Sequence, residues 1–96
     1  MSIVACATAL PAHTAVIRLA GADAAAIAAR AGLPTPPPWT ISATTWPLGP
    51  CRVWRATAPR SSTGTDVVEI LLPGAPDLVA AALDRLIAAG AEPAGP

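Results

Sequence analysis

Lysine is absent from this 96-residue chain, and charged residues of any kind are scarce. Six arginines balance six acidic residues, so a formal net charge of zero offers no field to attract a nucleic-acid backbone. Without lysine the chain also cannot form a phosphate-binding P-loop, whose GK[ST] step needs that side chain. Disorder is disfavoured too, because 53% of the residues are hydrophobic. We therefore expect a globular domain that does not bind nucleic acid directly.

Large apolar side chains are also few. The sequence has no phenylalanine or tyrosine and three tryptophans, whereas 24 residues are alanine, which buries little surface. A chain of this length forms one small domain, residues 1–96, whose core is thin. This favours association with a partner or a second copy.

Cysteine and histidine are too few for a structural metal site. Cys6, Cys51 and His13 do not supply the four ligands that zinc normally requires. The N-terminus lacks the features of a signal peptide, and no apolar run is long enough to span a bilayer. We therefore expect a cytoplasmic protein with no membrane association, no bound metal and two reduced thiols.

The hydrophobic pattern predicts an α+β domain. Short β-branched runs and alternation indicate strands, and helical spacing with Gly32 and Gly90 as stops indicates two helices. The expected order is β-β-α-β-β-β-α, with both helices on a mainly antiparallel sheet. The strands are expected at residues 2–8, 15–20, 39–46, 51–57 and 66–72, and the helices at 24–31 and from Pro76 to Gly90.

The connections carry clear local signals. Asp23 stands at the N-cap position of the first helix, and residues 33–38 (LPTPPP) form a rigid, extended linker inside the domain. Residues 47–50 (PLGP) predict the turn of a hairpin. The tail, residues 91–96, is too proline-rich to add a regular strand by itself.

Three segments in this order resemble one family. SIVACAT resembles the opening "DTIVAxAT" of the tRNA-modifying GTPases called TrmE or MnmE, and AVIRLAG resembles that family's "AIxIxRxSG" strand. SSTGTDVVEI, followed by Gly74 and Pro76, resembles "S[YF]TGEDxVEIxxHGGP", and the final helix with GAEPAGP resembles "GARxAxPGEF". The resemblance covers nearly the whole chain apart from the middle hairpin.

The resemblance implies the fold of the family's N-terminal domain, which is similar to the folate-binding part of the glycine-cleavage T-protein. It implies binding of a tetrahydrofolate one-carbon derivative, such as 5-formyl- or 5,10-methylene-tetrahydrofolate, and a homodimer. It also implies a link to modification of the tRNA wobble uridine, together with other parts of that complex. The P-loop GTPase and the C-terminal cysteine motif of the family are not among these residues, so we expect no catalysis from them alone.

This sequence departs from the family pattern at four places. Residues 9–14 replace a glycine-rich turn, and Thr65 stands at the glutamate of TGED. Pro73 stands at the histidine of HGG, and Ala75 at its second glycine. A proline at that position removes both an imidazole and an N–H donor. These changes favour the alternative that the domain has lost the ability to bind folate and acts as an assembly or dimerisation module.

The resemblance places Arg18 and Glu69 at the folate site, and Thr63 and Gly64 before Asp66 are candidates for a ligand-facing loop beside it. A carboxylate can accept two N–H donors from a pterin edge, and an arginine can hold a carbonyl or carboxylate. The alternative is that Arg18 and Glu69 pair with each other or face solvent. Thr63 and Gly64 equally fit a turn capped by Asp66.

The tryptophans, the remaining arginines and the histidine are weaker candidates for a functional site. The three tryptophans fit a core or an interface better than a stacking platform. Arg52, Arg55 and Arg60 form a modest basic cluster, too small for tRNA contact alone, and His13 is expected on the surface.

Overall fold

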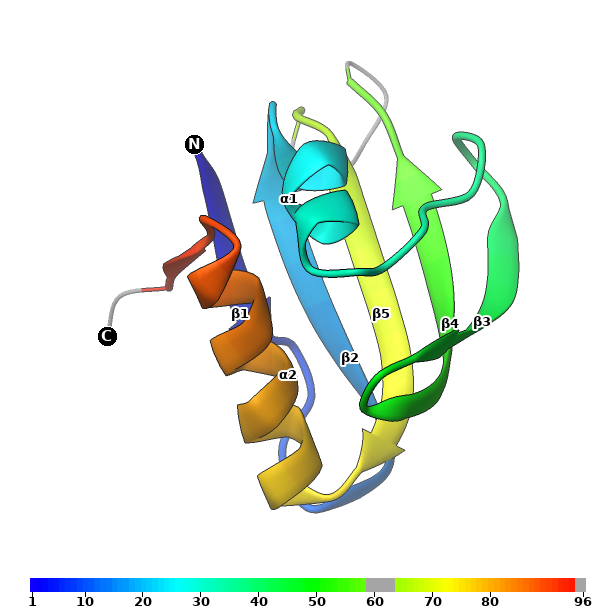
Figure 1. The fold of residues 1–96 in the computed structure, drawn as a ribbon, viewed down its shortest axis with the longest axis vertical. Helices are drawn as coiled ribbons and strands as arrows, with labels where there is room; N and C mark the ends of the chain where they lie inside the picture. The colour runs from blue at the N-terminus through cyan, green and yellow to red at the C-terminus, as the bar shows by residue number, and fades with distance from the viewer. Residues whose placement is uncertain (59–63, 95–96) are drawn as a thin grey trace.

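The computed structural model describes residues 1–58 and 64–94 of the chain. Its strands form one six-stranded sheet in the order β3-β4-β5-β2-β1-β6, and both helices lie on the same side of it (Figure 1). The elements are β1 (Ser2–Cys6), β2 (Ala12–Gly21), α1 (Ala24–Arg30), β3 (Ile41–Trp46), β4 (Gly49–Ala56), β5 (Val67–Gly74), α2 (Pro76–Ala88) and β6 (Glu92–Pro93).

The α+β class and the order of helices and strands are confirmed. Neighbouring strands are antiparallel except for β1 and β6, which are parallel. The two-residue strand β6 was not expected in the proline-rich tail. It forms because Ile3 and Val4 of β1 provide a pairing edge for Glu92 and Pro93.

The core lies between the helices and the sheet. Helix α1 is built almost wholly of alanine, so its backbone packs close to the sheet through Ala24, Ile27 and Ala28, all fully buried. The facing strands contribute Ile17, Val53 and Ile70, which are also fully buried. Small residues on one helix therefore compensate for the scarcity of large ones.

Helix α2 packs on the sheet through an apolar stripe at helical spacing. Val79, Ala82 and Leu86 are buried against the sheet, whereas Ile87 is 38% exposed. Ile87 lies at the margin of the stripe, so its side chain reaches solvent.

Arginines join the C-terminal ends of the two helices. Arg85 of α2 donates from Nε to the carbonyl of Ala31 at 2.8 Å, and Trp46 of β3 donates its Nε1–H to the same oxygen at 2.9 Å. In return, Arg30 of α1 donates from Nε to the carbonyl of Ala89 at 3.0 Å. Each arginine thus donates to a carbonyl at the C-terminal end of the other helix and complements the dipole of that helix.

Asp23 occupies the N-cap position of α1, but its side chain makes no capping bond to the helix. Its carboxylate instead accepts a hydrogen bond from the hydroxyl of Ser2 and lies 3.5 Å from the Met1 ammonium. The predicted N-cap position of Asp23 is therefore confirmed, but its side chain bonds to the N-terminal end of β1 instead of to the helix. The Ser2 hydroxyl holds the pKa of Asp23 below its ordinary value.

Candidate functional site: an open sheet face and a notch between strands

One face of the sheet carries no helix (Figure 1). Side chains alternate along each strand, so the residues that do not point toward the helices point to this face. One cross-strand row on it joins all the longer strands in register. The row consists of Ala5, Arg18, Glu69, Trp54 and Ile41.

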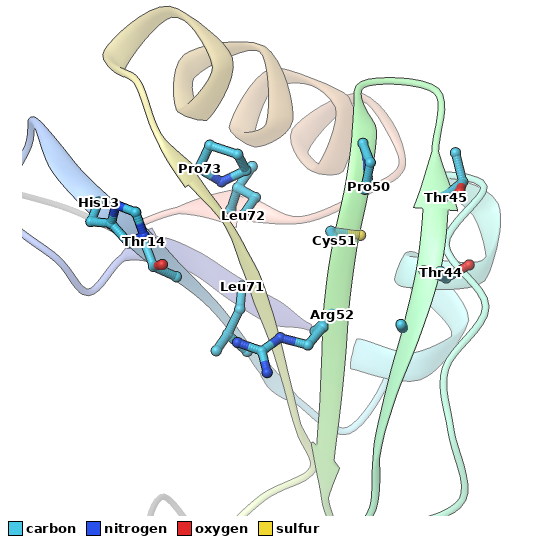
Figure 2. Close-up of a pocket in the computed structure, with 11 residues that line it drawn as sticks. His13, Thr14, Thr44, Thr45, Pro50, Cys51, Arg52, Leu71, Leu72 and Pro73 are labelled. Carbon is cyan, nitrogen blue, oxygen red and sulfur yellow. The ribbon is translucent and has the colours of Figure 1, made fainter.

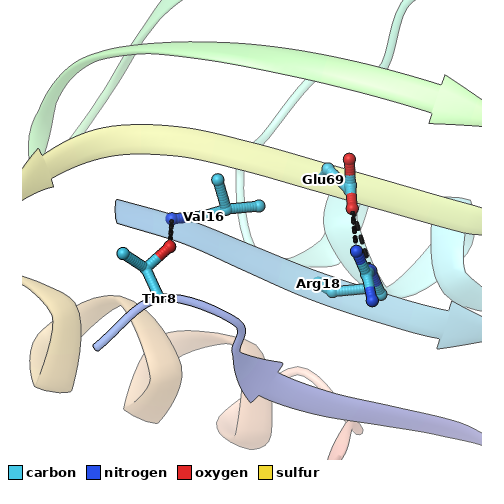
Figure 3. A network of polar contacts seen from close by, with 4 residues as sticks. All are labelled: Thr8, Val16, Arg18 and Glu69. Atoms are coloured by element: carbon cyan, nitrogen blue, oxygen red, sulfur yellow. Dashed lines mark hydrogen bonds and ion pairs between the residues drawn. The ribbon is translucent and has the colours of Figure 1, made fainter. Parts of the chain in front are cut away.

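Arg18 and Glu69 form an ion pair at the middle of this open face (Figure 3). They are direct register partners on β2 and β5. The Nε and Nη2 atoms of Arg18 each lie 2.8 Å from Oε2 of Glu69. The side chains are 45% and 20% exposed, so the pair is reachable from solvent. The structure thus brings the two predicted ligand residues together and pairs them with each other.

Both contacts from Arg18 end on one oxygen of Glu69, Oε2. A carboxylate has about four lone-pair positions over two oxygens, so Oε1 remains able to accept from a ligand. The two contacts from the arginine also fix the orientation of the carboxylate.

Of the other two predicted ligand residues, Gly64 lies shortly before the start of β5, and Thr63 is outside the described residues. Gly64 is exposed and has a φ of +74°, a backbone conformation that glycine adopts at little cost. Asp66 accepts a hydrogen bond from the backbone N–H of Ala58 at 3.1 Å, which joins the two ends of this loop. This geometry agrees with the turn interpretation, and a ligand role for either residue stays a prediction.

The three tryptophans do not form a common platform. Trp46 is buried in the core at 2% exposure. Trp39 and Trp54 meet edge to face, with ring centroids 6.0 Å apart and planes at 81°. Trp39 is 42% exposed and contacts the open face through Trp54. The pair therefore extends the apolar surface beside Glu69, in agreement with the core or interface interpretation.

A pocket of about 760 Å³ opens where strands β4 and β5 separate (Figure 2). The strands pair from Ala56 opposite Val67 as far as Arg52 opposite Leu71, and beyond that point each continues without the other. We call this opening the β4–β5 notch. Its lining comprises His13, Thr14, Ala43, Thr44, Thr45, Pro50, Cys51, Arg52, Leu71, Leu72 and Pro73.

Two prolines explain why the pairing stops at this point. The backbone N–H and C=O of Arg55 bond to residues at the β3 side of the sheet. Because the direction of bonding alternates along a strand, the backbone groups of the even-numbered residues of β4, such as Arg52, point toward β5. In the same register, the next hydrogen-bonded pair after Arg52 and Leu71 would be Pro50 and Pro73. Neither residue has an N–H, so neither hydrogen bond of that pair can form. The strands separate there, and both prolines line the notch.

The lining of the notch includes side chains that can donate hydrogen bonds to an anion, and it includes no acidic side chain. Arg52 is exposed on its rim, His13 lies on the opposite side, and the lining contains no carboxylate (Figure 2). Within residues 1–58 and 64–94, no carboxylate forms an ion pair with Arg52. Burial raises the pKa of the Cys51 thiol, which makes it a poor nucleophile near neutral pH.

The notch was missed at the sequence level. The predicted cluster of Arg52 and Arg55 does not form in the described part of the chain, because alternation along β4 directs the two side chains to opposite faces. Arg60 lies outside the described residues. Pro50 was expected in the hairpin turn and the strand before Pro73 was expected to end at residue 72, whereas the structure places both prolines inside strands. A proline inside a strand indicates an interrupted ladder.

The described residues contain no group of three or more histidine, cysteine or acidic side chains that could hold a metal ion. None of the described helices is both long enough and apolar enough to cross a bilayer.

Two helices on one face of a mainly antiparallel sheet, with the other face open around an arginine–glutamate pair, define a small α+β domain. The family model for the N-terminus of the GTP-binding protein TrmE matches residues 2–96, and the chain belongs to this family. No curated protein matches it.

Proposed function

We propose that this domain binds a tetrahydrofolate one-carbon derivative on its open sheet face and associates there as a homodimer. In this proposal it contributes to modification of the tRNA wobble uridine, the process with which its family is concerned. Membership of the TrmE N-terminal family and the Arg18–Glu69 pair on the open face support it.

Glu69 is the residue on which the folate proposal depends most. The ring of a pterin presents adjacent N–H donors, and a fixed carboxylate accepts such donors well. Arg18 holds Glu69 through Oε2 alone, so the carboxylate is oriented while Oε1 stays available. Arg18 therefore positions Glu69, and its remaining N–H groups can donate to a carbonyl or carboxylate of the ligand.

The open face also carries the exposed apolar residues that a dimer would bury. Ile3 and Ile41 are 50% and 52% exposed and lie on either side of the ion pair, on β1 and β3. Trp39, 42% exposed, adds to the same side through its contact with Trp54. Exposed apolar groups gathered on one face are typical of an interaction surface. Because the folate residues share this face, the two functions are coupled by position.

Isothermal titration calorimetry with 5-formyltetrahydrofolate tests the folate proposal. The wild-type domain is expected to bind, and Glu69→Gln to bind at least tenfold more weakly, because one acceptor oxygen becomes an amide N–H₂. Glu92→Gln is the matched control, since Glu92 lies exposed on the edge strand β6. Equal affinity of wild type and Glu69→Gln would refute the role given to Glu69.

The alternative function is an assembly module that no longer binds folate. Pro73 and Ala75 favour it, because they replace the histidine and second glycine of the family pattern. The ion pair is also compatible with it, since Arg18 and Glu69 contact each other without a ligand. A folded protein that dimerises but releases no heat with millimolar 5-formyltetrahydrofolate would establish this alternative over the folate proposal.

A further inference from the structure

We propose that the β4–β5 notch is a second ligand site, specific for a small aromatic carboxylate. The notch is separate from the Arg18–Glu69 pair, since neither residue is among its lining residues. The inference depends on Pro50, Pro73 and Arg52 of this chain, and it holds whether or not the open face binds folate.

The size and lining of the notch suit a small molecule. Its volume of about 760 Å³ falls within the range of roughly 300–1,000 Å³ typical of ligand pockets. Leu71 and Leu72 from β5, Ala43 from β3 and the rings of Pro50 and Pro73 provide apolar contact. A flat apolar ring can therefore lie between the separated ends of the two strands.

The charge of the notch selects an anion. Arg52 is the cation of the lining; it stands in register with Leu71, and its guanidinium extends toward β5 across the mouth of the notch (Figure 2). The planar guanidinium matches the two oxygens of a carboxylate. The imidazole of His13 and the hydroxyl of Thr14 stand on the opposite wall, where they can donate to the same group.

The prolines supply a third element of recognition. The carbonyl groups of Pro50 and Pro73 point in the direction of the missing rungs, because the bonded positions of β4 and β5 alternate. Each lacks the N–H partner that the other strand would have provided. These carbonyls can accept from an amino substituent on the ring, which orients the ligand with its carboxylate toward Arg52.

The test is a ¹⁵N-HSQC titration with benzoate and, separately, with the neutral isostere benzamide. Benzoate is expected to shift the amide signals of Cys51, Arg52, Leu71 and Leu72, and to bind at least fivefold more tightly than benzamide. Equal affinity for the two ligands, or benzoate shifts that avoid these amides, would overturn the proposal.

Two variants and a control sharpen the result. Arg52→Gln is expected to remove the preference for benzoate, whereas Arg55→Gln, on the opposite face of the same strand, is expected to keep it. Ala43→Trp, at an exposed lining position, is expected to weaken both ligands by filling the notch. A preference for benzoate that survives in Arg52→Gln would contradict the proposal, and so would unchanged binding in a folded Ala43→Trp variant. Folding of each variant is checked by its dispersed amide spectrum.

Discussion

Pro50 on β4 and Pro73 on β5 stand at facing positions where the next rung of the sheet would form. Because the direction of bonding alternates along a strand, Pro50 does not need an N–H for the pairing of β4 with β3. In the same way, Pro73 does not need an N–H for the pairing of β5 with β2. Two prolines are thus tolerated inside a six-stranded sheet, and their joint effect is local. They end the β4–β5 ladder and open the notch beside Arg52.

The first prediction follows from this pair. The double variant Pro50→Val with Pro73→Val restores two N–H donors, so we expect β4 and β5 to pair one rung further. Hydrogen exchange monitored by NMR is expected to show slow exchange at the amides of both new valines. Each single variant provides one donor only and serves as the control. Rapid exchange at both positions of the double variant would show that the prolines do not cause the separation.

The second prediction concerns the arginine that closes the end of α1. Arg85→Ala removes the bond to the Ala31 carbonyl, and we expect a loss of about 1 kcal/mol in the free energy of unfolding. The loss stays moderate because Trp46 still donates to the same oxygen. Urea denaturation measures it, with Arg52→Ala as an arginine substitution that breaks no bond of this kind. Equal stability of Arg85→Ala and wild type would contradict the capping role.

The third prediction is a pH dependence at the N-terminus. The pKa of Asp23 is lower in the folded protein than its ordinary value of 3.8, chiefly because Ser2 donates a hydrogen bond to the carboxylate. A lowered folded pKa adds stability above the unfolded pKa, and this stability is lost as the pH falls through the folded value.

The comparison of wild type with Asp23→Asn measures that contribution. The difference in their free energies of unfolding is expected to be constant near neutral pH and to shrink as the pH falls below about 4. Ser2→Ala is expected to reduce the difference at neutral pH, since it removes the largest cause of the shift. A difference that grows as the pH falls would have the wrong sign for this interaction.

The fourth prediction locates the dimer interface. Ile41→Asp places a charge on the open face, and we expect it to weaken self-association at least tenfold in sedimentation equilibrium. Ile87→Asp is the matched control, because Ile87 is also exposed but lies on α2, on the helical side. If both substitutions weakened the dimer equally, the open face would not be its interface.

Most of the fold could be predicted from the sequence because its signals are local. Alternation, turn prolines and glycine stops placed all of the longer strands and both helices. The differences from the prediction arise from contacts with other segments. Strand β6 forms because β1 provides an edge for pairing, and the Asp23 side chain bonds to Ser2 instead of to its helix. These contacts join segments that are distant in the sequence, so local patterns do not reveal them.

The site was harder to predict for the same reason. Arg18 and Glu69 were identified through the resemblance, but their pairing depends on a register between residues 51 positions apart. The notch depends on Pro50 and Pro73 facing each other, which becomes visible only once β4 and β5 are aligned. That Arg52 lines the notch and Arg55 does not follows from their placement on opposite faces of β4.

The most direct test of the folate proposal is a ¹⁵N-HSQC titration of the wild-type domain with 5-formyltetrahydrofolate. We expect saturable shifts centred on the amides of Arg18 and Glu69 and their neighbours on the open sheet face. Shifts confined to the β4–β5 notch would show that the ligand binds there and not at Arg18 and Glu69, and would contradict the proposed folate site. A spectrum unchanged at millimolar ligand would contradict folate binding by this domain.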